Sequence, residues 1–441
     1  MGALLTMGNA TMWSVYLKPS SASAELTRKL GRFSRQAYYG AAAPLRMRRI
    51  PVPALPGPQW VRVRNRIAGI SRSDLTTIEL MTNPGVSLAA MRLPRRVYPG
   101  RQVVGEVVAV GDDAQLLRPG DRVVWQYGPC CPTRGIDPAC HACAGGNFAL
   151  CAYRSIPPKP APTGGGWSEE MVLHERQLFL VPDAMSDEEA ALLEAAARAV
   201  HASLRRQPQP GEQALVIGTD VEGMLLIQAL RAFGPNVNIA ALLDAPYHAE
   251  MAARMGASQT IRRDEATEGI ARVTGSQRLS NEHGAEIFAG GFDVVYDTVG
   301  SDQTLQSALR WTRPEGAVVL AGQRPIPLRL DLTPVWHAEV TLYGVAAPGM
   351  ERWETDTGRG AGRISSFALA ANLMRDRRLT PERLVTHRFP LREFRRAVMA
   401  LQHGEEHQTL QALLDIVPPQ FPPTIPAPIS QPQATRARSS R

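Results

Sequence analysis

Residues 216–234, with the sequence VIGTDVEGMLLIQALRAFG, decide the fold class of this chain. The segment opens with apolar residues and reaches a turn at Gly218, after which apolar side chains recur at helical spacing. This order predicts a buried strand, a tight turn and a helix. In a parallel sheet, such an arrangement often places the backbone N–H groups of the helix N-terminus against the phosphates of a dinucleotide.

The turn departs from the usual dinucleotide-binding pattern of three glycines. Gly218 and Gly223 occupy the first and third positions, but Asp220 occupies the second and Glu222 follows closely. The first glycine makes the turn, the second lets backbone approach the pyrophosphate, and the third packs the helix on the strand. Asp220 therefore has two open roles. Either its carboxylate caps the helix where a phosphate would bind, or it turns outward and the phosphates bind one step away.

Strand-like and helix-like segments alternate after residue 213. The expected strands are 214–218, 237–243, 293–297, 317–321 and 340–345, and the expected helices are 221–233, 246–255 and 302–312. This alternation predicts a parallel sheet with helices on both faces, which is a doubly wound α/β fold.

The chain before residue 186 has a different pattern. Short alternating stretches such as WVRVRNRIAG are separated by Gly/Pro turns, which predicts a β-rich domain. Ser186 and Glu189 then form the capping pattern that starts a helix. Residues 20–45 are polar, small and basic without a clear period, so we expect an insertion or a loose arm there. The Pro-rich segment after Val417 is expected to be extended or disordered.

The net charge of +8 is concentrated at the two ends of the chain. Residues 1–49 contribute +7 and residues 417–441 contribute +3, which leaves −2 for the rest. A nearly neutral body argues against a nucleic-acid-binding protein. The sequence has no apolar run long enough to span a membrane, and its first residues lack the pattern of a secretory signal. We therefore expect a cytoplasmic protein without a membrane or nucleic-acid partner.

All five cysteines lie close together in the sequence: Cys130, Cys131, Cys140, Cys143 and Cys151. The spacing Cys-x2-Cys-x7-Cys wraps a loop around one point, as a tetrahedral zinc site requires. Asp137 continues the three-residue step before Cys140. We therefore predict a structural zinc site formed by Asp137, Cys140, Cys143 and Cys151, with Cys130 or Cys131 as the alternative fourth ligand. A metal-free loop or a disulfide is the competing interpretation.

The order of these parts resembles the medium-chain dehydrogenase/reductase superfamily, specifically its zinc-dependent alcohol dehydrogenase branch. The phrases AGISRSDL, GDRVV, FDVVYDTVGS and DLTPVWHAEVTLYG and the cysteine lobe carry the resemblance, which covers roughly residues 46–416. It implies a GroES-like β-rich domain, a Rossmann domain and a last segment that returns to the first domain. The expected divisions are an N-terminal arm (1–45), the GroES-like domain (46–195), the Rossmann domain (196–362), the return segment (363–416) and the tail (417–441).

The resemblance also indicates that ligands of the family's catalytic zinc are replaced here. Ser71 stands where the family usually has a cysteine ligand, and Arg101 stands where it has a histidine ligand. An arginine cannot bind zinc, and its charge would repel the ion. Glu194 lies near a further ligand position, where we expect it to pair with Arg101. The chain is therefore expected to work without a catalytic zinc, and the candidate catalytic residues are Ser71, Ser73 and Arg101.

Other positions match family residues. Ser73 matches a hydroxyl that relays a proton from the substrate, Arg72 matches a position that contacts the cofactor phosphates in some members, and Asp74 matches an acid that supports the metal site. Asp244 follows the second strand of the Rossmann segment, where an acid accepts a hydrogen bond from the ribose 2′-hydroxyl. No arginine follows close by in the sequence to bind a 2′-phosphate. We therefore predict NAD as the cofactor, with NADP as the second choice.

Two functions are compatible with these observations. The first is a nicotinamide-dependent oxidoreductase that acts without catalytic zinc on a small alcohol, a carbonyl compound or an activated alkene, with Arg101 or Ser73 polarising the substrate. The second is a catalytically silent dehydrogenase-like scaffold that binds a small molecule or a partner. We favour the first. The family resemblance further suggests a homo-oligomer.

Overall fold

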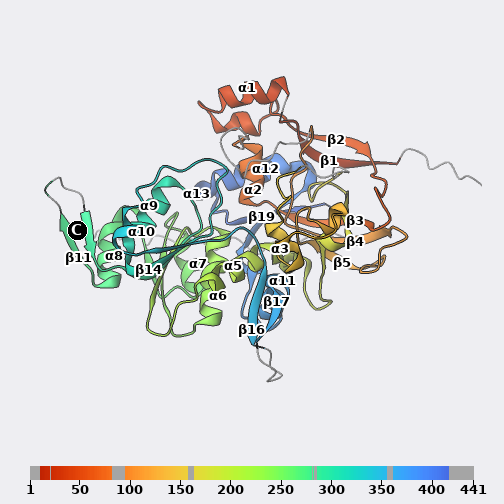
Figure 1. Ribbon diagram of the computed structural model, residues 1–441. Helices are drawn as coiled ribbons and strands as arrows, with labels where there is room; N and C mark the ends of the chain where they lie inside the picture. Colours follow the sequence, from red (N-terminus) through yellow and green to blue (C-terminus); the bar gives the residue numbers. More distant parts are fainter. Residues whose placement is uncertain are drawn as a thin grey trace, which may run out of the picture.

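The structure is a computed structural model and describes residues 10–19, 21–81, 95–156, 163–280, 282, 286–354 and 361–416. Two large sheets organise it, one mostly antiparallel and one parallel (Figure 1). The expected Pro-rich tail lies outside the described residues. Within the described part of the chain, no helix has the length and apolar character needed to cross a membrane.

The second half of the chain forms a six-stranded parallel sheet with the order β10-β9-β8-β13-β14-β15. Its strands are β8 (Gln213–Ile217), β9 (Asn238–Leu242), β10 (Gln259–Ile261), β13 (Phe292–Asp297), β14 (Thr312–Leu320) and β15 (Thr341–Gly344). The helices between them are α6 (Val221–Phe233), α7 (His248–Arg254), α8 (Ala266–Thr274), α9 (Asp302–Trp311) and α10 (Thr333–His337). The predicted doubly wound α/β fold is confirmed. The strand order reverses between β8 and β13, and such a reversal opens a crevice at the carboxyl ends of the strands.

The β-rich part contains a seven-stranded sheet in which β3 is the hub. Its strands are β3 (Trp60–Gly69), β4 (Val103–Val110), β5 (Arg122–Trp125), β6 (Glu170–His174), β7 (Leu178–Leu180), β18 (Val385–Pro390) and β19 (Gln411–Asp415). β3 coincides with the predicted strand WVRVRNRIAG. β18 and β19 come from the far end of the chain, and β19 pairs antiparallel with β3. The last segment therefore joins the first sheet and holds the two halves together.

Several helices connect or cover the sheets. They are α2 (Arg72–Ile78), α3 (His141–Ala144), α4 (Asp187–Ala191), α5 (Leu193–Arg205), α11 (Ser366–Arg375), α12 (Phe394–Gln402) and α13 (Gly404–His407). α4 begins at the predicted capping pattern, because Ser186 Oγ accepts from the Glu189 N–H and the Glu189 carboxylate accepts from the Ser186 N–H. Two hairpins that the sequence did not suggest complete the fold: β11 (Gln277–Ser280) with β12 (Glu286–Ala289), and β16 (Met350–Glu354) with β17 (Ala361–Ser365).

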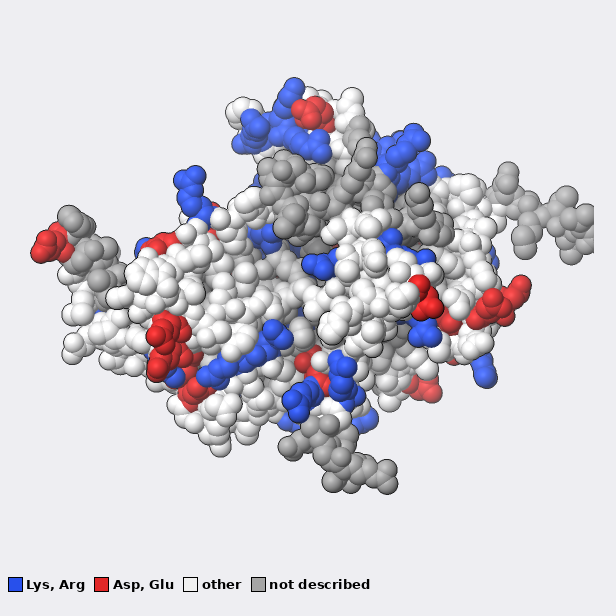
Figure 2. Space-filling model, in the orientation of Figure 1, with Lys and Arg blue, Asp and Glu red and all other residues white. Residues whose placement is uncertain are grey.

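The described part of the N-terminal arm differs from the expected loose segment. β1 (Thr11–Leu17) and β2 (Leu45–Pro51) form an antiparallel two-stranded sheet, and α1 (Ala22–Leu30) lies in the connection between them. The arm is ordered because Val15, Leu17 and Leu45 are buried in the core of the β-rich domain. Its cationic side chains gather on the outside, over α1 at the top of the molecule (Figure 2). β2 was missed because Arg46, Arg48 and Arg49 interrupt its apolar residues, and β1 was missed because its pairing partner is distant in sequence.

Candidate functional site

Four of the five cysteines meet in one lobe of the β-rich domain. The Sγ atoms of Cys131, Cys140, Cys143 and Cys151 all lie within 4.8 Å of one another. The sulfurs of Cys131 and Cys151 are 3.7 Å apart, close to the distance of about 3.8 Å that follows from tetrahedral zinc with Zn–S bonds of about 2.3 Å. All five cysteines are free thiols. The lobe therefore has the donor set and the shape that a closed structural zinc site requires.

The predicted fourth ligand, Asp137, is corrected by the structure. Asp137 is exposed and is not part of the group, whereas Cys131, one of the alternatives, completes it. The chain turns back after Cys131, so that the Cys140 N–H donates to the Cys131 sulfur at 3.4 Å. Sequence spacing suggested Asp137 because it continued the three-residue step, but the turn brings a more distant thiol closer. Cys130 is buried beside the group without belonging to it.

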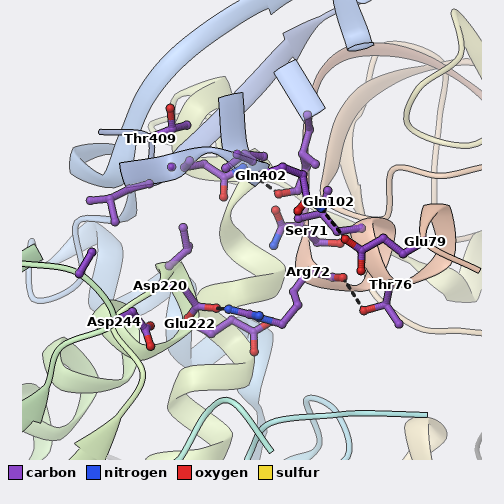
Figure 3. Close-up of a pocket in the computed structure, with 18 of the residues that line it drawn as sticks. Ser71, Arg72, Thr76, Glu79, Gln102, Asp220, Glu222, Asp244, Gln402 and Thr409 are labelled. Atoms are coloured by element: carbon purple, nitrogen blue, oxygen red, sulfur yellow. Dashed lines mark hydrogen bonds and ion pairs between the residues drawn. The ribbon is translucent and has the colours of Figure 1, made fainter. Parts of the chain in front are cut away.

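A cavity of about 570 Å³ lies between the two halves of the molecule, at the carboxyl ends of β8 and β9. It is lined from both halves and from the last segment (Figure 3), including by Ser71, Arg72, Gln102, Asp220, Glu222, Asp244, Gln402 and Thr409. The cavity therefore brings together the glycine turn, the ribose-side acid and Ser71. Ser73 and Arg101 do not belong to its described lining residues.

The glycine turn has the geometry that its sequence predicts. Gly218 has a φ of +95°, and a Cβ there would lie 2.5 Å from Thr298 Oγ1. At Gly223 a Cβ would lie 2.0 Å from the Gly218 carbonyl oxygen. A side chain at Gly223 would therefore force the helix away from the strand, and one at Gly218 would clash with the residues that follow β13. The two glycines hold the N-terminus of α6 tightly against the end of β8.

Asp220 caps α6 and at the same time bridges the two halves. Its Oδ1 accepts from the Gly223 N–H at 3.1 Å, and its Oδ2 accepts from Arg72 Nε at 3.0 Å and Nη2 at 2.5 Å. Burial raises the pKa of Asp220, but the charge and hydrogen bonds of Arg72 outweigh it, so the pKa is lowered and the carboxylate stays ionised. Both the helix N-terminus and the Arg72 guanidinium, the two groups suited to an anion, thus hold the carboxylate of Asp220 (Figure 3).

Asp244 lines the cavity just after β9. Its Oδ2 accepts from the Thr219 N–H at 2.7 Å, and its Oδ1 accepts from Arg263 Nη2 at 2.7 Å. No arginine follows Asp244 closely in the sequence, but the fold brings Arg263 into contact with it. Arg263 is 19 residues further along the chain, and the parallel pairing of β10 with β9 brings it back beside Asp244.

The candidate catalytic serines lie on the first turn of α2. Ser71 Oγ donates to Asp74 Oδ2 at 2.6 Å and lies 2.8 Å from Ser73 Oγ. The N–H groups of Ser71 and Gly100 also donate to Asp74, at 2.9 and 2.8 Å. Burial raises the pKa of Asp74 despite these donors. Ser71 therefore presents a hydroxyl to the cavity that is backed by a buried carboxyl group.

Arg101 and Glu194 form the expected pair. Arg101 Nε lies 3.6 Å from Glu194 Oε1, and Arg101 Nη2 donates to the Gln126 carbonyl at 3.1 Å. The guanidinium carbon is 5.8 Å from the centre of the Trp125 ring. These contacts hold Arg101 against the β-rich domain.

Two further side chains were not predicted from the sequence: Gln102 in the cavity lining, and Arg198 beside the lining residue Glu222. Arg198 Nη1 lies 3.2 Å from Glu222 Oε1, and burial raises the pKa of Glu222. Gln102 is buried beside Ser71, and its Oε1 has no hydrogen-bond partner among the described residues. The signal for Gln102 was its position next to Arg101 in the family's metal-binding segment. Arg198 gave none, because it lies within an Ala-rich helical stretch.

Family models match both halves of the chain. The model of the alcohol dehydrogenase GroES-like domain matches residues 57–183, and the model of the zinc-binding dehydrogenase domain matches residues 223–359. Sorbitol dehydrogenase of Bacillus subtilis is 29% identical over 306 residues, which cover 68% of this chain and 78% of that protein. L-idonate 5-dehydrogenase of Vitis vinifera is 27% identical over 337 residues, which cover 76% of this chain and 81% of that protein.

A solved structure shows the same architecture. The crystal structure of 2R,3R-butanediol dehydrogenase from Bacillus subtilis superposes with a TM-score of 0.64 at 24% sequence identity, and covers 85% of this chain and 96% of that one. The resemblance found in the sequence is therefore confirmed. The chain belongs to the zinc-type alcohol dehydrogenase branch of the medium-chain dehydrogenase/reductase superfamily and is an alcohol dehydrogenase-like, NAD(P)-dependent oxidoreductase.

Proposed function

We propose that this chain transfers hydride between a nicotinamide cofactor and a small alcohol or carbonyl compound, with the Ser71–Asp74 pair in place of a catalytic zinc. The observation that carries the proposal is the Ser71 hydroxyl, which lines the cavity and lies 2.6 Å from a buried carboxyl group of raised pKa. The names of the relatives, sorbitol and L-idonate 5-dehydrogenases, favour a polyhydroxylated substrate. An activated alkene remains a second substrate class.

The side chains at the family's metal-ligand positions do not suit a divalent cation. Ser71 offers a hydroxyl that already donates to Asp74, and Arg101 brings a permanent positive charge. Glu194 is the one carboxylate of the three, and Arg101 neutralises it at 3.6 Å. The proposed reaction therefore uses no metal ion at the positions of Ser71, Arg101 and Glu194.

The cleft suits a dinucleotide in shape. Asp220 lines it at the α6 N-terminus, Asp244 lies at the proposed ribose end, and Gln102, whose Oε1 has no hydrogen-bond partner among the described residues, lies at the other end near Ser71. A buried polar atom without a partner is costly unless a ligand satisfies it. The bound nicotinamide would supply or accept the hydride. The phosphates would have to exchange with Asp220 at Arg72 and the helix end.

Ser71 is the group that we assign to proton transfer. As hydride reaches a carbonyl carbon, its oxygen gains negative charge and takes the proton of the Ser71 hydroxyl. When Asp74 is protonated, its O–H donates to Ser71 Oγ and replaces that proton, after which Asp74 regains one from solvent. Asp74 acts through Ser71 and is a positioning residue and proton store. The reverse direction, alcohol oxidation, runs through the same atoms.

We further propose that the cysteine lobe holds one zinc ion that stabilises the fold without taking part in the reaction. The four thiols of the lobe support this, because closed four-sulfur sites leave no open position for a substrate. The remaining expectations are a cytoplasmic homo-oligomer with a small-molecule substrate and no nucleic-acid or membrane partner. The chain between its two basic ends is nearly neutral, which supports the expectation of no nucleic-acid partner.

The proposal is tested with Ser71→Ala and Asp74→Asn, using Thr77→Ala on the same helix as the control. We expect both variants to keep NAD(P)H binding, measured by fluorescence titration, and to lose about 10²-fold or more in turnover. Carbonyl reduction by the wild type should slow as pH rises through the raised pKa of Asp74, because the proton store empties, and Asp74→Asn should abolish that dependence.

Two outcomes would contradict the proposal. Turnover that survives both substitutions would remove Ser71 and Asp74 from the reaction. An absence of cofactor binding at millimolar concentration would favour the second candidate function, a catalytically silent scaffold. The ion pair between Asp220 and Arg72 at the expected phosphate position is the observation that supports this alternative.

A further inference from the structure

We propose that Arg263 is a 2′-phosphate ligand, and that the Asp244–Arg263 pair lets the cleft accept NADP(H) as well as NAD(H). The inference rests on the proposed binding of a dinucleotide in the cleft with its adenosine ribose at Asp244. It revises the cofactor preference that Asp244 alone suggested. Arg263 is far from Asp244 in sequence, so only the folded chain reveals the pair.

The two carboxylate oxygens of Asp244 have different hydrogen-bond partners. Oδ2 accepts from the Thr219 N–H at 2.7 Å, and the Asp244 N–H in turn donates to Thr219 Oγ1 at 2.9 Å. These reciprocal bonds fix the carboxylate at the edge of the glycine turn. Oδ1 is bonded to Arg263. It is therefore the atom that a ribose hydroxyl would use if Arg263 moved aside.

Arg263 is positioned by strand pairing. β10 lies parallel to β9 with Ile261 opposite Leu242, so the residues just after the two strands meet at the same edge of the sheet. The Arg263 side chain is 55% exposed and also lines a second cavity of about 230 Å³ that includes Trp311 and Ser307. The guanidinium thus stands between two hollows, and its exposed ion pair is worth only about 0–1 kcal/mol. It can exchange partners at little cost.

The charges account for the dual preference. A lone carboxylate at this position accepts from the 2′-hydroxyl of NAD and repels the 2′-phosphate of NADP. A guanidinium beside it offers a bidentate, charge-assisted contact to a phosphate and offsets the repulsion. With NAD, Arg263 would swing into solvent and leave Oδ1 of Asp244 to the 2′-hydroxyl. With NADP, it would leave Oδ1 and hold the phosphate, while Thr219 keeps Asp244 in place.

The neighbouring residue provides a matched control. Arg262 is also exposed, but it pairs with Asp264 at 2.5 Å and belongs to the described lining of neither cavity. Neutralising Arg262 removes the same charge from the same surface loop without touching Asp244. The comparison therefore separates a specific contact from a general electrostatic effect.

The test measures the binding of NADH, NADPH, 5′-AMP and adenosine 2′,5′-bisphosphate by titration calorimetry or fluorescence. We expect Arg263→Gln to weaken NADPH and the bisphosphate at least tenfold and to change NADH and AMP less than threefold. Arg262→Gln should leave the ratio of the two affinities within twofold. Asp244→Asn should shift the ratio in the opposite direction, toward NADPH.

An equal loss for both cofactors, or no loss, in Arg263→Gln would overturn the inference. The AMP-type probes contain no nicotinamide, so they report on this site even if the chain catalyses no hydride transfer. Nucleotide binding without discrimination by Arg263 would therefore count against this inference alone. Failure of every nucleotide to bind would overturn both this inference and the proposed function.

Discussion

The cysteine lobe and the cofactor cleft differ in the partners of their polar groups. In the lobe, four sulfurs lie within 4.8 Å of one another. In and around the cleft, four carboxylates each have an arginine partner. The pairs are Asp220 with Arg72, Asp244 with Arg263, Glu222 with Arg198, and Glu194 with Arg101. The lobe therefore places four metal-binding sulfurs around one point, whereas the carboxylates of the cleft are paired with arginines of the same chain.

This contrast decides what a ligand does to each region. A metal in the lobe displaces thiol protons but breaks no ion pair, so its binding free energy contributes to folding. A dinucleotide in the cleft must replace the Asp220 carboxylate at Arg72 and at the α6 N-terminus before its phosphates are held. The lobe is therefore expected to bind its guest far more tightly than the cleft binds its own.

The largest effect is predicted for Cys131→Ser. One zinc per chain should fall to nearly none, and the melting temperature should drop, because a hydroxyl replaces a thiolate in a closed four-sulfur site. Metal analysis and thermal unfolding measure the two quantities. Chelation of the wild type should produce the same drop.

Two substitutions serve as controls for the lobe. Cys130→Ser removes a buried thiol that lies beside the group, and Asp137→Asn removes the carboxylate that spacing alone had suggested. Both should keep the zinc. Loss of zinc in Asp137→Asn with retention in Cys131→Ser would reverse the ligand assignment.

A smaller effect, about tenfold, is predicted for cofactor affinity in Asp220→Asn. Asparagine is as good an N-cap as aspartate, so α6 should remain intact. The substitution removes one negative charge from the phosphate position and releases the Arg72 guanidinium. NADH should therefore bind more tightly, by about 1.4 kcal/mol for a tenfold change. Fluorescence titration measures it.

Glu250→Gln is the matched control for Asp220→Asn. Glu250 also pairs with an arginine, Arg254, but on the exposed surface of α7 and outside the described cavity lining. Its neutralisation should leave cofactor affinity unchanged. Weaker NADH binding in Asp220→Asn would mean that the Asp220–Arg72 bridge holds the cleft in its binding shape, and that the contrast between lobe and cleft is wrong.

The parallel-sheet half of the fold was predictable because its signals are local. Gly218, Gly223 and the helical period after them lie within one short segment, and the structure places β8 and α6 there. The N-terminal arm was not predictable, because β1 and β2 are distant in sequence and basic residues interrupt the apolar pattern of β2. Its order depends on burial against the β-rich core.

The candidate site was predictable in its residue types but not in its partners. The pairing of Arg101 with Glu194 was predictable because the family resemblance places both residues at or near ligand positions of the same metal site. The pair Asp244–Arg263 and the fourth thiol at Cys131 did not, because strand pairing and a chain reversal create them. Sequence spacing shows which residues are close along the chain, whereas the site depends on which residues are close in space.

The smallest effect is predicted for Arg101→Gln. If the charges of the cleft are all paired internally, Arg101 contacts Glu194 and the Gln126 carbonyl rather than the substrate. Its loss should cost about 1–3 kcal/mol of stability, because the buried Glu194 carboxylate loses this partner, and should change turnover less than about threefold. Arg122→Gln, which breaks a comparable pair with Asp187 away from the cavity, gives the reference for a purely structural loss. A fall of 10²-fold in turnover beyond that reference would place Arg101 on the substrate and return polarisation to its guanidinium.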